Sequence, residues 1–517
     1  MLDAPLSFFA PLVLLTAAAI AWMRPGRRPA LTPRLSDAAA LAALAFAAAG
    51  AGQLALTGPA QVAILGGVLT LRFDAIGATM TLLVAFVGWV VLRYARTYLD
   101  GAGREGRFHS LILATLSSVL ILTQSGDLGT MIGAFVGVGL GLRALLLFFP
   151  ERAEAHRAAM KFSLVWHAAD AALIAAAALV FAAYGTVEFA ALSASAGPGL
   201  PVAAHVAVAF LVLAAALKTA AFPAHGWLTE VMEAPTPVSA LLHAGIINAG
   251  GFLLIRTADL VQASSGAMAA LVFVGGFTAL FGAVVMLTQS AIKTALAWST
   301  VAQMGFMLLQ CGLGLWPLAL LHIVAHSMYK AHAFLSAGGA VRAVAGSRRP
   351  GPIAVPDLHA VLKSFILALA LYAGMAALFT LVAGPKSPQA LALGTMLIFG
   401  VAYLVAQGLA DAAPAALTRR TTLASLWAAA AYFGFQLAAN LVWGPHLPAA
   451  PAAGALEWAL IVLAVVSFGL VALAQALFPL WAHHPAAAGL RVHLANGLYL
   501  NALLDRLIGG FRVTKSS

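Results

Sequence analysis

The sequence predicts an all-α polytopic membrane protein, and two observations carry that prediction. Apolar residues make up 62% of the 517-residue chain and charged residues only 9%, whereas a soluble domain carries about 25% charged residues. A water-soluble fold of this length could not cover its surface with so few charges. In addition, the chain is divided into long apolar runs, and a membrane-spanning helix needs about 20 apolar residues. We therefore expect about 13 to 15 transmembrane helices.

The expected spans follow one another without a gap long enough for a soluble domain. The first should be a retained helix, because Arg24, Arg27 and Arg28 follow it, whereas a cleaved signal has its charges in front. Polar and Pro- or Gly-rich breaks place the spans near residues 7–23, 36–57, 75–95, 108–125, 128–149, 161–184, 203–228, 237–260, 267–288, 291–312, 315–342, 358–383, 389–410, 422–443 and 454–478.

Basic residues alternate between loops and predict the topology. The net charge is +11, but the basic residues lie in short gaps between apolar runs and form no soluble basic face, which argues against nucleic-acid binding. Loops after odd-numbered spans are rich in them, and the alternate loops are nearly bare, with Arg72, Arg256 and Lys386 as the main exceptions. This alternation predicts an N-terminus outside the cell and a cytoplasmic C-terminus.

The tail, residues 481–517, differs from the spans because its leucines mix with polar residues in a pattern typical of an amphipathic helix. Such a cytoplasmic helix lies either at the membrane surface or against a partner protein, and both interpretations stay open. For the second, the candidate docking residues are Asn496, Tyr499 and Arg506.

Ionisable side chains inside a membrane are costly and are therefore functional candidates, and Lys218 is the first of them. It follows fourteen mostly apolar residues, which places it about 20 Å into the expected span 203–228. Pro223 should break the helix five residues later, and a broken helix survives in lipid only where a polar interior satisfies its backbone. A lysine that snorkels to an interface is the alternative, but the long span favours a buried proton carrier.

His243 lies about two turns inside the next span, which Pro235 and Pro237 are expected to begin. A lone histidine can be a hydrogen-bonded packing residue or a proton relay. The neighbouring Lys218 favours the relay.

A row of His322, His326 and Lys330 occupies one face of the span 315–342, because the residues are four positions apart. In a membrane this row predicts a polar path for protons. The two histidines also resemble half of a zinc site, but no third ligand follows at a suitable spacing. Lys293 begins the preceding span and is either a further link of the path or a boundary lysine.

Carboxylates are scarce in the spans. Asp170 lies about 13 Å into the span 161–184, with His167 one turn before it on the same face. A carboxylate at that depth should be paired or protonated, and Lys218 is its natural partner. Glu230 and Glu233 flank the break after that lysine; they form either the point where protons enter or a plain polar loop.

Three stretches resemble the antiporter-like subunits of respiratory complex I and of multisubunit sodium/proton antiporters. They are KTAAFPAHGWLTEVMEAPTPVSALLHAGIINAGGFLLIR (218–256), IKTALAWSTVAQMGFM (292–307) and HIVAHSMYKAHAFLSAG (322–338).

The resemblance covers about residues 70–345, and it implies two inverted five-helix repeats, each built round a broken helix. The implied parts are helices 1–3 in 1–107, the first repeat in 108–260, a degenerate second repeat in 261–412, further spans in 413–480 and the tail in 481–517.

The chain departs from that family in both repeats. The family carries a glutamate in a Trp-Glu-Gly-Val-Gly stretch of its fifth helix, and the matching stretch here has Val136 in the glutamate's place. The family also carries a buried lysine or glutamate on helix 12. Here Lys363 and Lys386 lie near the ends of the spans, so the second half-channel is expected to be incomplete.

These departures resemble one branch, the membrane subunit of DAB inorganic-carbon accumulation complexes. The stretches that match it are LRALLLFFPERAEAHRAAMKF (142–162), FPAHGWLTEVMEAPTPVSALLHAGIINAGGF (222–252), SPQALALG (387–394) and VHLANGLYLNALLDRL (492–507).

The resemblance implies a subunit of a bacterial inner-membrane complex that uses a cation gradient, of protons or Na⁺, to drive CO₂ hydration and bicarbonate accumulation. The implied partner is a carbonic-anhydrase-like subunit of the DabA type, which would hold the zinc; no cofactor is expected in this chain. Two alternatives remain, an antiporter-like subunit of a respiratory NADH:quinone oxidoreductase or Mrp-type Na⁺/H⁺ antiporter, and a membrane anchor that moves no ion. The costly row of ionisable residues argues against the anchor.

Overall fold

Helices build almost the whole molecule in the computed structural model, which describes residues 4–197, 199–346, 357–408, 415–481 and 483–507. All fifteen expected spans coincide with helices. They are α1 (Phe9–Trp22), α2 (Thr32–Thr57), α3 (Ala75–Tyr98), α4 (Glu105–Thr123), α5 (Leu128–Leu146), α6 (Ala153–Tyr184), α8 (Val202–Lys218), α10 (Thr236–Ala244) with α11 (Ala249–Arg256), α13 (Ser265–Met286), α14 (Ile292–Gly312), α15 (Trp316–Gly346), α16 (Leu358–Ala383), α17 (Pro388–Gly408), α18 (Ala415–Trp443) and α19 (Ala455–Ala476).

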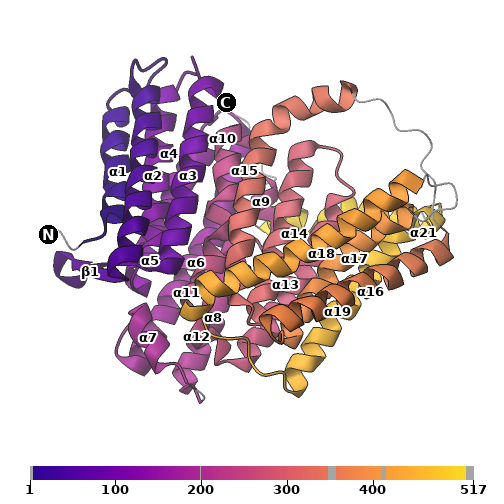
Figure 1. The fold of residues 1–517 in the computed structure, drawn as a ribbon. Helices are drawn as coiled ribbons and strands as arrows, with labels where there is room; N and C mark the ends of the chain where they lie inside the picture. Colours follow the sequence, from indigo (N-terminus) through magenta and orange to yellow (C-terminus); the bar gives the residue numbers. More distant parts are fainter. Residues whose placement is uncertain (1–3, 198, 347–356, 409–414, 482, 508–517) are drawn as a thin grey trace.

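The fold class predicted from composition is confirmed. Within the described ranges, ten helices are long and apolar enough to cross a membrane, and three further apolar helices are shorter. The two remaining expected spans, α14 and α15, are less apolar, because they carry polar residues such as Lys293 in α14 and His326 and Lys330 in α15. Figure 1 shows α1 to α4 as an upright bundle, with α16 to α19 running at a tilt on the other side of the molecule. The predicted domain boundary at 412/413 lies outside the described residues.

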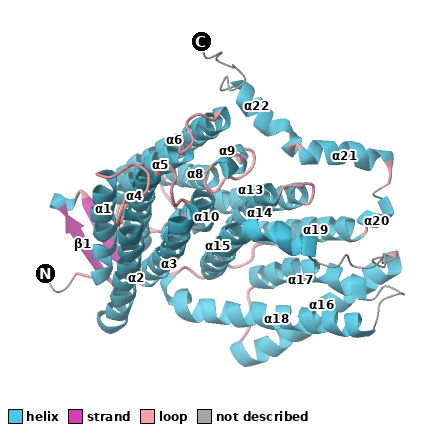
Figure 2. Ribbon diagram, turned by 90° about the horizontal axis from the view of Figure 1, so that it is seen from above, coloured by secondary structure: helices cyan, strands magenta, loops and turns pink. Residues whose placement is uncertain are grey.

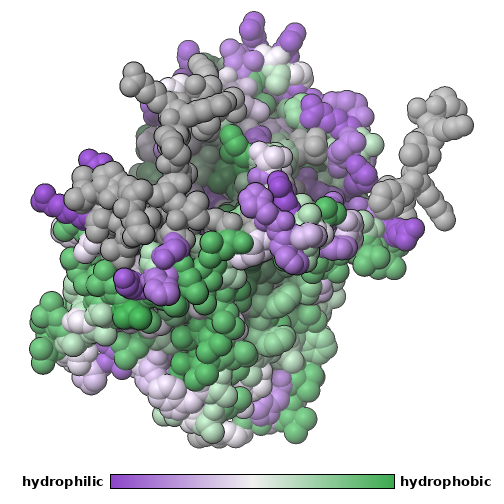
Figure 3. Space-filling model, turned by 90° about the vertical axis from the view of Figure 1, so that its right-hand side faces the viewer, coloured by the Kyte–Doolittle hydropathy of each residue, from purple (hydrophilic) through white to green (hydrophobic). Residues whose placement is uncertain are grey.

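The outer surface of the C-terminal helices is rich in large apolar side chains. Leu381 is 85% exposed and Trp427 is 73% exposed, and Figure 3 shows hydrophobic surface over much of this side with hydrophilic residues gathered above it. Soluble monomers rarely expose apolar patches of this extent. This surface is therefore suited to lipid or to another membrane subunit.

Aspartates fix the start of three helices. Asp74, Asp127 and Asp357 precede α3, α5 and α16, and each accepts a hydrogen bond from the backbone N–H three residues later. A helix leaves its first N–H groups without internal partners, and an aspartate at this position satisfies one of them. These three aspartates therefore help to determine the residue at which each helix begins.

A β-hairpin, which the all-α prediction did not include, joins α2 to α3. Strand β1 (Ala60–Ile64) pairs antiparallel with β2 (Leu69–Phe73), so that Ala60 lies opposite Phe73. The turn between them contains Gly66 and Gly67 at φ 69° and 94°, a backbone region that glycine enters at no steric cost. Figure 2 shows the two strands at one edge of the molecule.

An ion-pair cluster beside this hairpin explains two basic residues in loops predicted to be bare. Arg256 Nη1 lies 2.6 Å from Asp74 Oδ2, and Arg72 Nε lies 2.9 Å from the same oxygen. Burial alone would raise the pKa of Asp74, but the charge and hydrogen bond of Arg256 hold it well below its usual range. These arginines therefore fasten the end of α11 to the start of α3.

The chain between α8 and α13 is interrupted at two points. Helix α8 ends at Lys218, five residues before Pro223, and only the short α9 (Gly226–Thr229) and η3 (Val231–Glu233) precede α10. Proline cannot continue a helix, so the break predicted in span 203–228 is present, but the helix ends earlier than expected. Pro235 and Pro237 stand at the beginning of α10.

The second interruption corrects the prediction of one continuous span over 237–260. Helix α10 ends at Ala244, and η4 (Ile246–Asn248) separates it from α11. A further short helix, α12 (Ala258–Gln262), follows after Thr257. Unwound backbone at this depth is tolerated only where protein or a polar interior satisfies it.

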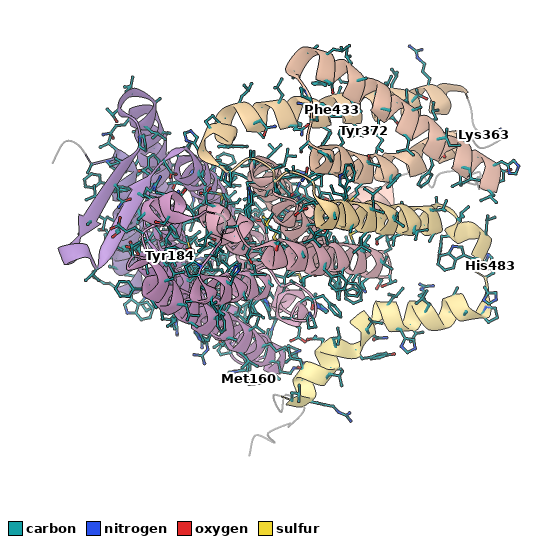
Figure 4. The ribbon with its side chains drawn as sticks, turned by 90° about the horizontal axis from the view of Figure 1, so that it is seen from below. Met160, Tyr184, Lys363, Tyr372, Phe433 and His483 are labelled. Carbon is teal, nitrogen blue, oxygen red and sulfur yellow. The ribbon has the colours of Figure 1, made fainter. Side chains whose placement is uncertain are left out.

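The C-terminal helices pack through aromatic rings. Tyr372 of α16 and Phe433 of α18 stack with their centroids 5.4 Å apart, and Figure 4 shows the two side chains meeting between the helices. Lys363 is exposed near the start of α16, and Lys386 lies in the loop before α17. Among the side chains described in α16 and α17, no Lys, Arg, His, Asp or Glu is buried.

Candidate functional site

A buried ion pair between α6 and α8 forms the centre of the first candidate site. Lys218 Nζ lies 2.7 Å from Asp170 Oδ1, and both side chains are buried. The ammonium group also lies 3.9 Å from the ring centroid of Trp166 and 4.2 Å from that of Phe135, distances typical of cation–π contacts. The structure thus brings together the two residues that the sequence suggested as partners.

The Asp170–Lys218 pair contains a carboxylate from α6, whereas α5 has Val136 at the position of the family's glutamate. Val136, which stands where the family carries its glutamate, is half-buried next to Phe135. Trp166 of α6 donates from Nε1 to the backbone oxygen of Phe135 at 3.0 Å, so α5 and α6 meet directly beside Lys218. Asp170 of α6 therefore provides the negative charge near this lysine. His167, about half-exposed, places Nδ1 3.3 Å from Asp170 Oδ2 at the rim of the pair.

A second polar group surrounds His243 in α10. Its Nδ1 lies 3.0 Å from Thr300 Oγ1 of α14, and its ring stacks on Phe334 of α15 with the centroids 4.4 Å apart. Both contacts fit a packing histidine. Its Nε2, however, is buried without a hydrogen-bond partner, and an unsatisfied buried polar atom is costly. That free nitrogen favours a group that exchanges protons.

The predicted row on α15 faces α10 and α14. His326 Nε2 lies 3.2 Å from the backbone oxygen of His243, and the rings of His322 and His326 are 6.0 Å apart. Lys330 is fully buried; its ammonium group donates to the backbone oxygen of Leu296 at 2.9 Å and also to Ser299 Oγ of α14. His326 and Lys330 therefore lie inside the protein, and His322 is half-buried on the same face of α15.

Lys293 lies at the edge of this group. Its ammonium group donates to Thr236 Oγ1 at 3.0 Å, and that hydroxyl donates in turn to the Tyr98 hydroxyl at 3.4 Å. The lysine is half-buried at the start of α14. It contacts the beginning of α10, and both roles, link and boundary residue, remain compatible with this position.

A buried lysine at the first position of the expected span 161–184 forms a third cluster. Lys161 is fully buried in α6; it forms ion pairs with Glu230 and, at 2.7 Å, with Asp505, and it donates to Asn501 Oδ1 at 2.7 Å. The helix begins at Ala153 rather than near residue 161. The alanine-rich stretch before the lysine was the available signal, because alanine is the strongest helix former.

The tail supplies two of these partners, which neither interpretation of it anticipated. It folds as α20 (Phe478–Trp481), α21 (Pro485–Ala495), η6 (Gly497–Tyr499) and α22 (Leu500–Leu507), with a kink where Leu498 and Tyr499 have positive φ. Figure 2 shows α21 and α22 returning along the outside toward α6 and α9. In Figure 4, Met160, the residue before Lys161, lies beside the tail.

The inner face of α22 fits closely against the break after α8. A Cβ at Gly226 would collide with the Asn501 side chain, and Asn501 Nδ2 also donates to Glu230 Oε1 at 2.5 Å. The predicted docking residues Asn496, Tyr499 and Arg506 are all exposed, and Asn496, the residue after α21, donates from Nδ2 to the backbone oxygen of Val492 at 2.8 Å.

The three clusters are not joined to one another by hydrogen bonds or ion pairs in the part of the chain that the structure describes. Among the described residues, no hydrogen bond or ion pair joins the Asp170–Lys218 pair to the His243 group or to Lys161. The side chain of Glu233 lies outside the described part of the chain. Within that part, no group of three or more His, Cys, Asp or Glu side chains is arranged to hold a metal ion.

Two family descriptions match the chain. Residues 125–353 match "NADH:quinone oxidoreductase/Mrp antiporter, TM", and residues 65–109 match "NADH-Ubiquinone oxidoreductase (complex I), chain 5 N-terminus". In three dimensions the chain is similar to a subunit in the structure of an Mrp complex from a Dietzia species, with a TM-score of 0.62 at 24% identity over 99% of this chain and 60% of that chain. At this identity the likeness establishes the antiporter-like fold alone.

Relatives with higher sequence identity show to which branch of this fold the chain belongs. The "Probable inorganic carbon transporter subunit DabB2" of Halothiobacillus neapolitanus is 39% identical over 461 residues, which cover 85% of this chain and 80% of that protein. A DabB protein of Hydrogenovibrio crunogenus is 41% identical over 59% of both chains. "NADH-ubiquinone oxidoreductase chain 5" of Metridium senile is 35% identical over 53% of this chain and 46% of that protein. The chain therefore belongs to the family of DabB inorganic carbon transporter subunits, which share the membrane fold of complex I and Mrp antiporter subunits.

Proposed function

We propose that this chain conducts protons through the membrane part of an energy-coupled inorganic carbon pump. The observation that carries the proposal is the burial of Lys218, His243, His326 and Lys330 inside the helix bundle. Ionisable groups at such depth are costly and mark ion pathways in membrane proteins. A protein that only anchored a partner would be more stable with apolar residues in these places.

The Asp170–Lys218 pair is suited to switching between two charge states. When the lysine carries a proton, the pair is neutral overall and stable at 2.7 Å; when the proton moves on, a buried carboxylate remains that attracts the next one. The broken backbone after α8 lets this end of the helix shift without unwinding a whole span.

The histidine row gives the path its second half. His243, His326 and Lys330 connect α10, α14 and α15 through direct contacts. Histidine and lysine hold a proton and release it again, as a relay requires. Protons crossing between the pair and this row would need water or a small movement of the interrupted segment between α10 and α11.

The coupled reaction belongs to a partner in this proposal. The relatives' printed names describe inorganic carbon transporter subunits, which supports membership of a hetero-oligomeric complex. The partner, a carbonic-anhydrase-like subunit of the DabA type, would hold zinc and hydrate CO₂, and the proton gradient would make that hydration run in one direction. The likeness to respiratory chain 5 keeps an electron-transfer complex as the alternative, but Val136 and the lack of a buried charge in α16 argue against it.

The test uses the complex expressed in bacterial cells. Lys218→Ala should abolish accumulation of labelled bicarbonate while the partner still co-purifies, and a protonophore should stop accumulation by the wild type. Lys363→Ala, which removes an exposed lysine of α16, should leave accumulation intact. Normal accumulation in the Lys218→Ala cells would remove this lysine from the mechanism, and NADH-dependent quinone reduction by the purified complex would favour the respiratory alternative.

A further inference from the structure

Three arginines gather around a cavity that the proposed ion path does not use. Arg104 and Arg107 at the start of α4 and Arg143 near the end of α5 line a cavity of about 240 Å³. Because the two helices are antiparallel neighbours, the arginines lie at the same end of the bundle. This is the end that the loop charges assign to the cytoplasm.

The cavity has cations but no anion. No acidic residue lines it, and none of the three arginines forms an ion pair with another described residue. Arg107 only lies over the Trp22 ring, 5.9 Å from its centroid. The three arginines are exposed, and they lack the carboxylate partner that Lys161, Lys218 and Arg256 each have. Three unpaired guanidinium groups around one space form a field that attracts an anion.

The rest of the wall is apolar and reaches the lipid-facing surface. The other lining residues are Leu111, Leu140, Ala144, Leu147 and Phe148. Leu140 is 55% exposed on the outer side of α5, one turn before Arg143 and further from the end of the helix. Ala144, Leu147 and Phe148 follow Arg143 at the end of the bundle, whereas Leu111 and Leu140 lie one turn further toward its middle than Arg107 and Arg143. From the arginines inward the wall is therefore apolar, which is the order of headgroup and acyl chain in a bilayer.

We propose that Arg104, Arg107 and Arg143 bind the phosphate of an anionic phospholipid, with its acyl chains along Leu111 and Leu140. Guanidinium groups match the oxygen geometry of a phosphate and hold it through paired hydrogen bonds. Basic pockets between transmembrane helices on the cytoplasmic side are suited to such headgroups. Such a lipid site would exist whether or not the chain conducts protons. A bound lipid would fasten α4 to α5, and α5 carries Phe135 beside Lys218.

The experiment compares two double variants of the full chain purified in mild detergent. Arg107→Gln/Arg143→Gln removes two cavity charges, whereas Arg34→Gln/Arg93→Gln removes two exposed arginines that do not line the cavity. Native mass spectrometry with added phosphatidylglycerol should show about thirtyfold weaker retention in the first variant and unchanged retention in the second. Equal retention in both would overturn the proposal.

A second measurement separates a lipid from a free anion and from a folding defect. Phosphatidylglycerol should raise the unfolding temperature of the wild type, and phosphatidylcholine or inorganic phosphate should not. The cavity variant should unfold at the wild-type temperature without lipid and lose the response to phosphatidylglycerol. If inorganic phosphate alone stabilises the wild type as much as the lipid does, the site binds a free anion and the lipid assignment is wrong. If the double variant does not fold, the single variant Arg104→Gln replaces it in both measurements.

Discussion

Breaking the Asp170–Lys218 pair from each side separates its contribution to stability from its role in transport. At 2.7 Å the gross attraction between two unit charges is about 6 kcal/mol at an effective dielectric constant near 20. The two aromatic rings beside the ammonium group add about 0.5 to 2 kcal/mol each. Removal of the pair from water opposes these gains, and removing one partner of a buried pair typically costs about 3 to 5 kcal/mol.

We therefore expect Asp170→Asn to lower the free energy of unfolding by about 3 to 5 kcal/mol, because it leaves a buried ammonium group without its carboxylate. Lys218→Met should cost less, since the remaining carboxyl group can take up a proton. The double variant Asp170→Asn/Lys218→Met should unfold within about 1.5 kcal/mol of the wild type, because no unpaired charge remains. Unfolding in mixed micelles measures all four proteins.

Transport should not follow stability in this series. The double variant should be stable and assembled but should accumulate no inorganic carbon, because neither residue can carry a proton. Two results would refute the reasoning. A stable double variant with full transport would show that the pair is structural, and single variants that unfold like the wild type would show that the charges are not buried together.

The remaining predictions concern the tail, the row on α15 and the hairpin end. Asn501→Ala should loosen α22 and speed protease cleavage after residue 495, whereas Arg506→Ala should not; equal rates would place α22 away from α6. His326→Gln should abolish carbon accumulation, and His332→Gln, an exposed neighbour, should preserve it; loss in both would indicate a general packing effect. Asp74→Asn should lower stability by about 3 to 5 kcal/mol at neutral pH. Folding lowers the pKa of this carboxyl, so its contribution to the free energy of unfolding is complete above about pH 5 and is lost only when the pH falls below that. If the stability difference between Asp74→Asn and the wild type faded at high pH instead, that would contradict the ion pairing.

The sequence predicted most of the helices because lipid imposes a simple rule on composition. An uninterrupted apolar run must be helical there, since every backbone group needs a partner. The same rule marks charged residues in the middle of a span as unusual, and this is why the sequence suggested Asp170 and Lys218 as partners. The helical spacing of His322, His326 and Lys330 fixed their common face without any tertiary information.

The features that escaped prediction depend on contacts between distant parts of the chain. Lys161 stands at the edge of an expected span, where a lysine is ordinary, and its partner Asp505 lies in the tail, so no local pattern connects them. The interruption after Ala244 has no proline beside it and lies in an apolar stretch, so a hydropathy pattern predicts one continuous helix there. The hairpin is short and lies between two long spans. Its composition does not distinguish a pair of strands from an ordinary loop.

Proton flux through liposomes that contain the chain with its partner subunit tests the central claim most directly. A pH-sensitive dye inside the vesicles would report flux driven by an imposed pH gradient, with CO₂ supplied to the partner. Lys330→Met is the decisive variant because its ammonium group is buried and contacts no carboxylate among the described residues. We predict flux in the wild type and none above that of protein-free vesicles in Lys330→Met; equal flux in the two proteins would contradict ion passage along the buried side chains.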